Sequence, residues 1–294
     1  MTSTSNFKSL SSTYYTATKT TVFYTGGWLL NYTSFDAQTI LGAYLATRRS
    51  THNLIYVDWS YYSKDIYFVP MIMKIDCVAQ QISAIIQKFR FDTWISPQTF
   101  HFIGFQYGAH VLAYGARKLL PPAVKRLTAL DPGAALDFTD LLFTRYGIDA
   151  ANWKDADFVD VIHTSAFKFG YGYDTGHIDF YVNGGSVQNG CTILQSIKDY
   201  RAANDIKQIY LLVCSHSRAV YYYAESVKRP NTSPLPFLSA RCGLVYTFNS
   251  TTCTNTLDNV SMGFYAYNPA GIGFGLSKRF YVETTNNTAK FSLT

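Results

Sequence analysis

The order of the hydrophobic patterns predicts an α/β fold, with a mainly parallel sheet that carries helices on both faces. Short runs of β-branched and aromatic residues alternate with segments of helical periodicity. A turn bounded by Gly104 and Gly108 joins one such run directly to a helical segment. The length, 294 residues, suits one doubly wound unit. We therefore expect residues 1–294 to form a single domain.

Six strands and three helices are expected in the first two thirds of the chain. The strands are predicted at 21–24, 54–58, 100–104, 127–130, 158–163 and 177–181, and the helices at 36–48, 71–91 and 107–120. Pro121 and Pro122 end the third helix, because proline has no N–H to continue it. Residues from about 231 to 294 are rich in Thr, Asn, Gly and aromatic residues without helical period, which predicts a β-rich or irregular C-terminal segment.

Composition excludes several classes of function. The net charge is +6, but the basic residues are scattered along the chain, so no nucleic-acid groove is indicated. No stretch approaches the roughly 20 apolar residues of a transmembrane helix. Cys/His clusters at zinc spacing and Gly-rich phosphate loops are absent from the sequence, and we expect neither a metal nor a cofactor.

Sequons and cysteines indicate an extracellular protein. Five Asn-x-Ser/Thr sequons are candidate glycosylation sites: Asn31, Asn231, Asn249, Asn259 and Asn286. The first residues lack the apolar region of a signal peptide, which taken alone indicates a cytoplasmic protein. The sequons and cysteines favour secretion instead, with the leader already removed or never included.

Five cysteines leave at least one thiol free. Spacing favours a Cys191–Cys214 bond and a Cys242–Cys253 bond, although spacing alone does not establish connectivity. Cys77 is then the spare thiol. It lies within the helical pattern of 71–91, where we expect it to be buried and inert.

The turn at residues 104–108 has the form of a nucleophile elbow, Gly-x-Ser-x-Gly, with Gln106 at the serine position. A serine hydroxyl there can lose its proton to a histidine and attack an ester, whereas a carboxamide cannot. Asp131 follows a predicted strand and His216 precedes a helical run, so the chain order matches nucleophile, acid and base. The pattern predicts a degenerate triad.

Five sequence blocks resemble the animal neutral lipase family, which includes pancreatic-type lipases, insect secreted phospholipases and the lipase-like yolk proteins of insects. They lie at 53–60, 101–115, 130–132, 157–164, and 176–191 together with 214–226. The resemblance implies an α/β-hydrolase fold, with Asp131 as the acid and His216 as the base. It also implies a lid loop at about 192–213, bracketed by Cys191 and Cys214, and no C-terminal β-sandwich domain.

The oxyanion-hole segment also departs from the family pattern. Family members carry His-Gly-aromatic after the first strand, and the backbone N–H of the aromatic residue helps to form the hole. Here the segment reads Gly26-Gly27-Trp28, so the former oxyanion-hole region is Gly27, Trp28 and Tyr107. Loss of a triad nucleophile removes about 10⁶ in turnover, and we expect an inactive lipase homologue.

The remaining polar residues are expected to have structural roles. The Gln106 amide can donate or accept a hydrogen bond toward His216, closing the network that the serine once completed. His163 is expected to be a core histidine with satisfied hydrogen bonds rather than a ligand.

Three functions follow from these features. The first is a secreted storage or yolk-type protein, for which a Tyr- and Phe-rich chain is an amino-acid reserve. The second is a non-hydrolytic carrier of a lipid or other hydrophobic small molecule in the former acyl cleft. The third is a weak esterase in which His216 activates water. The partly amphipathic lid is compatible with a packed flap or a membrane-contact face, and a homo-oligomer is also compatible with the sequence.

Overall fold

The structure is a computed structural model that describes residues 15–64, 68–119, 124–134, 150–191, 214–230, 237–242, 253, 260–267 and 278–284. The expected lid at 192–213 and four of the five sequons lie outside the described residues. Among the described helices, none has the length and apolar character needed to span a membrane. The described residues also hold no group of three or more His, Cys, Asp or Glu side chains suited to a metal ion.

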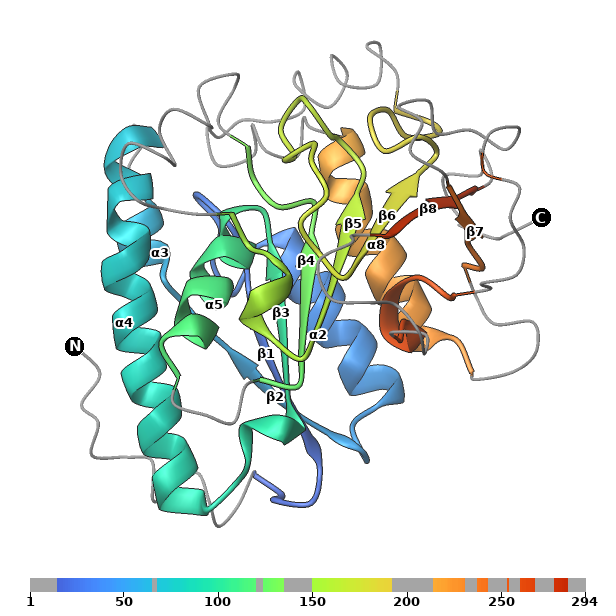
Figure 1. Ribbon diagram of the computed structural model, residues 1–294. Helices are drawn as coiled ribbons and strands as arrows, with labels where there is room; N and C mark the ends of the chain where they lie inside the picture. The colour runs from blue at the N-terminus through green and yellow to red at the C-terminus, as the bar shows by residue number, and fades with distance from the viewer. Residues whose placement is uncertain are drawn as a thin grey trace.

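The centre of the molecule is an eight-stranded sheet in the order β2-β1-β3-β4-β5-β6-β8-β7 (Figure 1). Its neighbouring strands pair in parallel, except for β7 against β8. The strands are β1 (Thr20–Thr25), β2 (His52–Tyr56), β3 (Phe100–Phe105), β4 (Arg126–Leu130), β5 (Phe158–His163), β6 (Ile178–Val182), β7 (Ala240–Arg241) and β8 (Lys278–Val282). All six predicted strands are present. The sequence did not indicate that the C-terminal segment supplies β8, which joins the main sheet beside β6.

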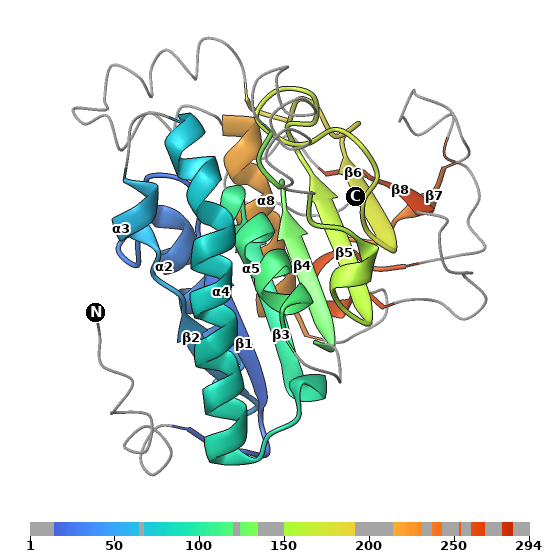
Figure 2. The same ribbon diagram turned by 60° about the vertical axis from the view of Figure 1, so that its left-hand side comes forward.

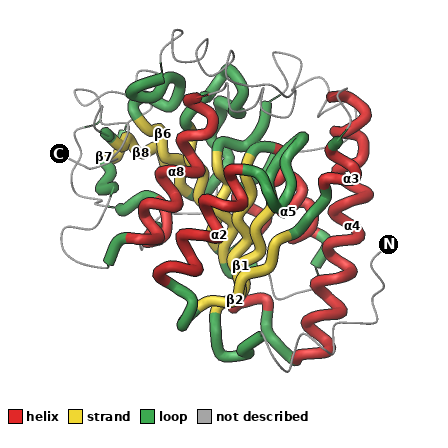
Figure 3. Tube along the Cα trace, turned by 180° about the vertical axis from the view of Figure 1, so that it is seen from behind, coloured by secondary structure: helices red, strands yellow, loops and turns green. Residues whose placement is uncertain are grey.

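Helices cover both faces of this sheet. The helices are α2 (Phe35–Thr47), α3 (Ser60–Ser63), α4 (Phe68–Thr93), α5 (Tyr107–Arg117) and α8 (Cys214–Lys228), and the short 3-10 helices are η2 (Pro97–Thr99), η3 (Trp153–Asp155) and η5 (Gly263–Tyr265). Figure 2 shows α4 and α5 side by side in front of the strands. Figure 3, from behind, shows α2 and α8 against the opposite face. The fold is the predicted α/β-hydrolase arrangement, with the third predicted helix ending three residues earlier than expected.

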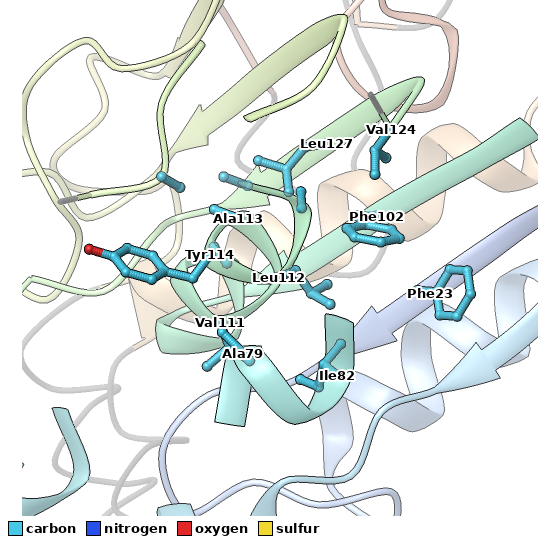
Figure 4. Close-up of a cluster of buried hydrophobic side chains, with 14 of the residues drawn as sticks. Phe23, Ala79, Ile82, Phe102, Val111, Leu112, Ala113, Tyr114, Val124 and Leu127 are labelled. Carbon is cyan, nitrogen blue, oxygen red and sulfur yellow. The ribbon is translucent and has the colours of Figure 1, made fainter. Parts of the chain in front are cut away.

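Alternation along the strands divides the core into two layers. Phe23 and Phe102 pack with α4 and α5 on one face, where Ala79 and Ile82 of α4 meet Leu112 of α5 (Figure 4). The intervening strand residues point to the other face and pack with α2 and α8; they include Val22, Tyr24, Ile103 and Phe105. Burying each large side chain contributes roughly 1.5–3 kcal/mol. These two layers hold β3 and β4 rigidly, and the candidate site lies at the carboxyl ends of these strands.

The prediction that Cys77 is buried was wrong, because this thiol is exposed. The helix was predicted correctly, but its periodicity assigns Ile75 and Val78 to the face on the sheet. At 100° per residue, position 77 falls on the outer face, one turn after the exposed Met73. Gln81 contacts the thiol, with its Nε2 3.6 Å from Sγ.

Candidate active site

Gln106 occupies a sharp turn between the end of β3 and the start of α5. Its backbone has φ 56° and ψ −125°, a left-handed conformation that costs a non-glycine residue about 1–3 kcal/mol. Two glycines make this turn possible. A Cβ at Gly104 would lie 2.4 Å from the backbone nitrogen of Ala109, and one at Gly108 would lie 2.6 Å from the carbonyl oxygen of Thr25. The turn therefore has the geometry of a nucleophile elbow, with Gln106 at its tip.

Asp131 follows β4 and is fully buried. Its carboxylate accepts hydrogen bonds from the backbone N–H groups of Thr164 (2.8 Å) and Ser165 (3.0 Å), from the Ser165 hydroxyl, and from Nδ1 of His216 (2.5 Å). Burial by itself raises the pKa of Asp131. The hydrogen bond and charge of His216, with the Ser165 and Thr164 hydrogen bonds, outweigh burial and lower this pKa below its usual value. Asp131 is thus ionised at neutral pH and can only accept hydrogen bonds.

His216 lies in the first turn of α8, whose first residue is tied to the loop after β6 by the Cys191–Cys214 disulfide. Its ring lies between two phenylalanines, with ring centroids 4.7 Å from Phe105 and 6.3 Å from Phe169. Because Asp131 only accepts, Nδ1 of His216 is the donor of the hydrogen bond between them. The Nε2 atom of His216 is buried and has no hydrogen-bond partner among the described residues.

The side chain of Gln106 lies against the segment Gly27-Trp28. Its Oε1 accepts a hydrogen bond from the backbone N–H of Trp28 at 2.8 Å. The side chain lies directly on Gly27, where an added Cβ would be 2.0 Å from Oε1 and 2.6 Å from the Gln106 Cβ. The prediction that Gln106 bonds to His216 was therefore wrong. The N–H of Trp28 can only donate, so its partner is the carbonyl end of the amide.

Gly26, which stands where the family has histidine, faces a buried carboxylate. A Cβ at this position would lie 2.4 Å from Oδ2 of Asp36. Asp36 is fully buried and accepts a hydrogen bond from the Tyr24 hydroxyl at 2.7 Å. Burial raises the pKa of Asp36 to about 6, although the Tyr24 hydrogen bond acts in the opposite direction. The position of Asp36 leaves no room for a histidine side chain at residue 26.

The other predicted residues lie as follows. His163 is a core histidine, as predicted, with Nε2 2.8 Å from Asp179 and Nδ1 3.0 Å from the carbonyl oxygen of Tyr171. The Tyr107 hydroxyl donates to the carbonyl oxygen of Ala134. At the Asn31 sequon, the side-chain oxygen accepts from the N–H and hydroxyl of Thr33. A second disulfide joins Cys242 to Cys253.

Ser165 is a site residue that sequence reasoning missed. Its hydroxyl donates to Asp131 and lies 3.2 Å from Nδ1 of His216. It follows β5 by two residues, and β5 pairs with β4, which ends one residue before Asp131. The adjacency of the two predicted strands is the signal that could have found it, because parallel neighbours end at the same edge of the sheet.

The parallel sheet, the sharp turn at Gln106 and the buried Asp131–His216 pair are those of the α/β-hydrolase fold. A family model described as "Lipase" matches residues 2–291, and the chain belongs to this lipase family. Pancreatic lipase-related protein 2 of Myocastor coypus is 31% identical over 242 residues, which cover 79% of this chain and 49% of that protein. Pancreatic triacylglycerol lipase of Oryctolagus cuniculus is 29% identical over 247 residues, 81% of this chain and 50% of that protein.

A third relative, inactive pancreatic lipase-related protein 1 of Homo sapiens, is 30% identical over 247 residues, covering 79% of this chain and 49% of that protein. As its name says, this relative is inactive. The chain spans about half the length of these relatives.

Proposed function

We propose that this protein is a catalytically inactive, secreted member of the lipase family that serves as a storage or yolk-type protein. The observation that carries the proposal is the position of Gln106. Its carboxamide stands where the nucleophile belongs, and its Oε1 accepts the hydrogen bond of the Trp28 N–H. In the family, the N–H at this position stabilises the oxyanion. The protein's own amide thus takes the place of a substrate carbonyl.

Two catalytic contributions to turnover are lost, that of the nucleophile and that of one oxyanion donor. Replacing the nucleophile removes about 10⁶ in turnover, and losing one oxyanion donor typically removes about a further 10²–10³. The Asp131–His216 pair persists because each partner would be left buried and unpaired without the other. An intact acid–base pair is therefore compatible with a protein that does not turn over esters.

Composition and cross-links support a reserve outside the cell. The chain contains 24 Tyr, 21 Phe and 4 Trp, so aromatic residues make up 17% of it, and a storage protein delivers such residues on degradation. The two disulfides suit an oxidising compartment. We further propose that residues 1–294 form one lipase-like domain.

An ester-hydrolysis assay tests the proposal. Wild type and His216→Ala should release p-nitrophenol from p-nitrophenyl esters at the same background rate, and an organophosphonate probe should label neither. Gln106→Ser is the informative variant. It should stay far below lipase-level turnover, because Gly26 still replaces the family histidine. Turnover in wild type that disappears in His216→Ala would overturn inactivity and support the weak esterase.

A second candidate function is a carrier of a hydrophobic ligand. Its support is the unpaired Nε2 of His216, which is buried beside Phe105 and Phe169. A buried polar atom without a partner is costly, and a ligand can supply the missing hydrogen bond. Mass spectrometry of native protein separates the two functions. A stoichiometric lipid supports a carrier, and its absence supports storage.

A further inference from the structure

A cavity of about 230 Å³ lies at the amino ends of β1, β2, β3 and β4, at the lower end of the sheet in Figure 1. We call it the amino-edge cavity. The first residue of each of these strands lines it, together with a phenylalanine of η5: Thr20, His52, Phe100, Arg126 and Phe264. The candidate active site lies at the carboxyl ends of β3 and β4, so the two sites are at opposite edges of the sheet.

The imidazole of His101 brings a polar atom without a protein partner to this cavity. His101 lines the cavity and is only 6% exposed. Its Nε2 lies 2.8 Å from Oγ1 of Thr128, whose hydroxyl donates to Asp160 at 2.9 Å. The hydroxyl proton is thus used, so Nε2 donates to the threonine oxygen. No hydrogen bond joins the other ring nitrogen, Nδ1, to any residue that the structure describes.

The ring of His101 is neutral, so its Nδ1 is an acceptor. Burial is the main cause that lowers the pKa of His101 well below its usual value, and repulsion from Arg126 and His52 lowers this pKa further. A neutral imidazole with its proton on Nε2 presents a lone pair at Nδ1. A ligand that completes the hydrogen bonding of the cavity therefore brings an O–H or N–H group to this atom.

The lining carries positive charge without an acidic side chain. Lys125 and Arg126 are its cations, and no Asp or Glu is among the described residues that line it. Arg126 is neutralised by Asp160, with N–O distances of 2.8 and 2.9 Å. The Lys125 side chain is 61% exposed, and its Nζ lies 3.8 Å from Asp157. Such a long, exposed contact contributes little, so Lys125 can pair with an anionic group in the cavity.

Aromatic rings and a small volume limit the shape of the occupant. The rings of His52 and Phe264 have their centroids 5.6 Å apart, and Phe100 is fully buried beneath the cavity. Flat apolar groups pack well on such rings. The volume of about 230 Å³ is below the roughly 300–1,000 Å³ of sites for drug-sized ligands. The occupant is therefore a molecule with a single ring.

We propose that the amino-edge cavity binds a small phenolic carboxylate, whose hydroxyl donates to Nδ1 of His101 and whose carboxylate pairs with Lys125. Its ring packs on Phe264 and His52. A methyl ether of the same acid offers no donor and cannot bond to Nδ1. The inference goes beyond the proposed function, because it uses none of the residues of the candidate active site.

Matched ligands test each contact. The 294-residue chain is titrated at neutral pH, by isothermal titration calorimetry, with 4-hydroxyphenylacetate, 4-methoxyphenylacetate and 4-(2-hydroxyethyl)phenol. The hydroxy acid should bind about tenfold more tightly than the methoxy acid, because one hydrogen bond to a buried acceptor has an effect of this order. It should bind about two- to fivefold more tightly than the uncharged phenol, the range for an exposed ion pair.

Variants then assign the contacts. Lys125→Met should remove the preference over the uncharged phenol and keep that over the methoxy acid. Lys64→Met is the matched control, because this exposed lysine follows α3 at the opposite edge of the sheet, and it should change neither preference. His101→Phe should remove the preference over the methoxy acid. Thr20→Trp places a large ring in the cavity from the exposed first residue of β1, and it should weaken all three ligands about tenfold or more.

Each contrary result overturns a stated part of the inference. Equal affinity for the hydroxy and methoxy acids refutes the hydrogen bond to His101, and no binding of any ligand refutes the site. Binding that Thr20→Trp leaves unchanged places the ligand elsewhere, which also overturns the inference and keeps it testable if His101→Phe fails to fold. Ester hydrolysis is measured separately, so failure here leaves the proposed function standing.

Discussion

A methyl group at Gly27 tests the hydrogen bond between the Trp28 N–H and Oε1 of Gln106. In Gly27→Ala the new Cβ would lie 2.0 Å from Oε1 and 2.8 Å from Cδ of Gln106, closer than real Cβ atoms approach their neighbours. Gly27 does not have a positive φ, so the backbone itself accepts alanine. The side chain of Gln106 must leave the Trp28 N–H. We expect a loss of about 1 kcal/mol for the hydrogen bond and about 1–3 kcal/mol for overpacking.

Denaturant unfolding in a double-mutant cycle measures the effect. Gln106→Gly removes the three atoms nearest to the new Cβ and suits the positive φ at residue 106. In that background Gly27→Ala should cost less than about 1 kcal/mol, so the coupling is about 2 kcal/mol. Gly42→Ala is the matched control. Nothing lies within 4 Å of its added Cβ on α2, and it should stabilise the protein by up to about 1 kcal/mol. An equal cost of Gly27→Ala in both backgrounds would refute the assigned position of Gln106.

Three further predictions concern buried charge and the free thiol. Burial raises the pKa of Asp36 to about 6, so the stability that its protonated form contributes is present below the ordinary pKa of about 3.9 and is lost as pH rises through 6. Asp36→Asn should remove this loss, which is about 3 kcal/mol in full, when unfolding free energies are measured from pH 4 to 7. An unchanged pH profile would contradict the raised pKa. Arg126→Met should destabilise by about 3–5 kcal/mol in denaturant unfolding, because it leaves buried Asp160 without its bidentate partner, whereas Lys88→Met, which breaks a solvent-exposed pair, should cost less than about 0.5 kcal/mol. Iodoacetamide should modify native protein at Cys77 alone, as read by peptide mapping; protection of this thiol until denaturant is added would show that it is buried.

The sequence by itself determined the local elements and their order. Alternation and helical periodicity are properties of neighbouring residues, so six strands and three helices could be located without knowing the fold. The turn at Gln106 could also be located, because a sharp turn needs glycines at fixed spacing. The order of Gln106, Asp131 and His216 is read directly from the chain. These features were sufficient to predict the α/β-hydrolase fold.

Only the tertiary structure decided how the site residues pair. Gln106 turns to Trp28 rather than to His216, Ser165 joins Asp131, and Cys77 faces solvent. Each outcome depends on donors, acceptors or packing surfaces that come from segments distant in the chain. A carboxamide offers a donor and an acceptor at its two ends, and the sequence does not state which partner lies within reach of either. The packing of β1, β3 and β4 brings the N–H of Trp28 to the acceptor end, and this contact determines the chemistry of the site.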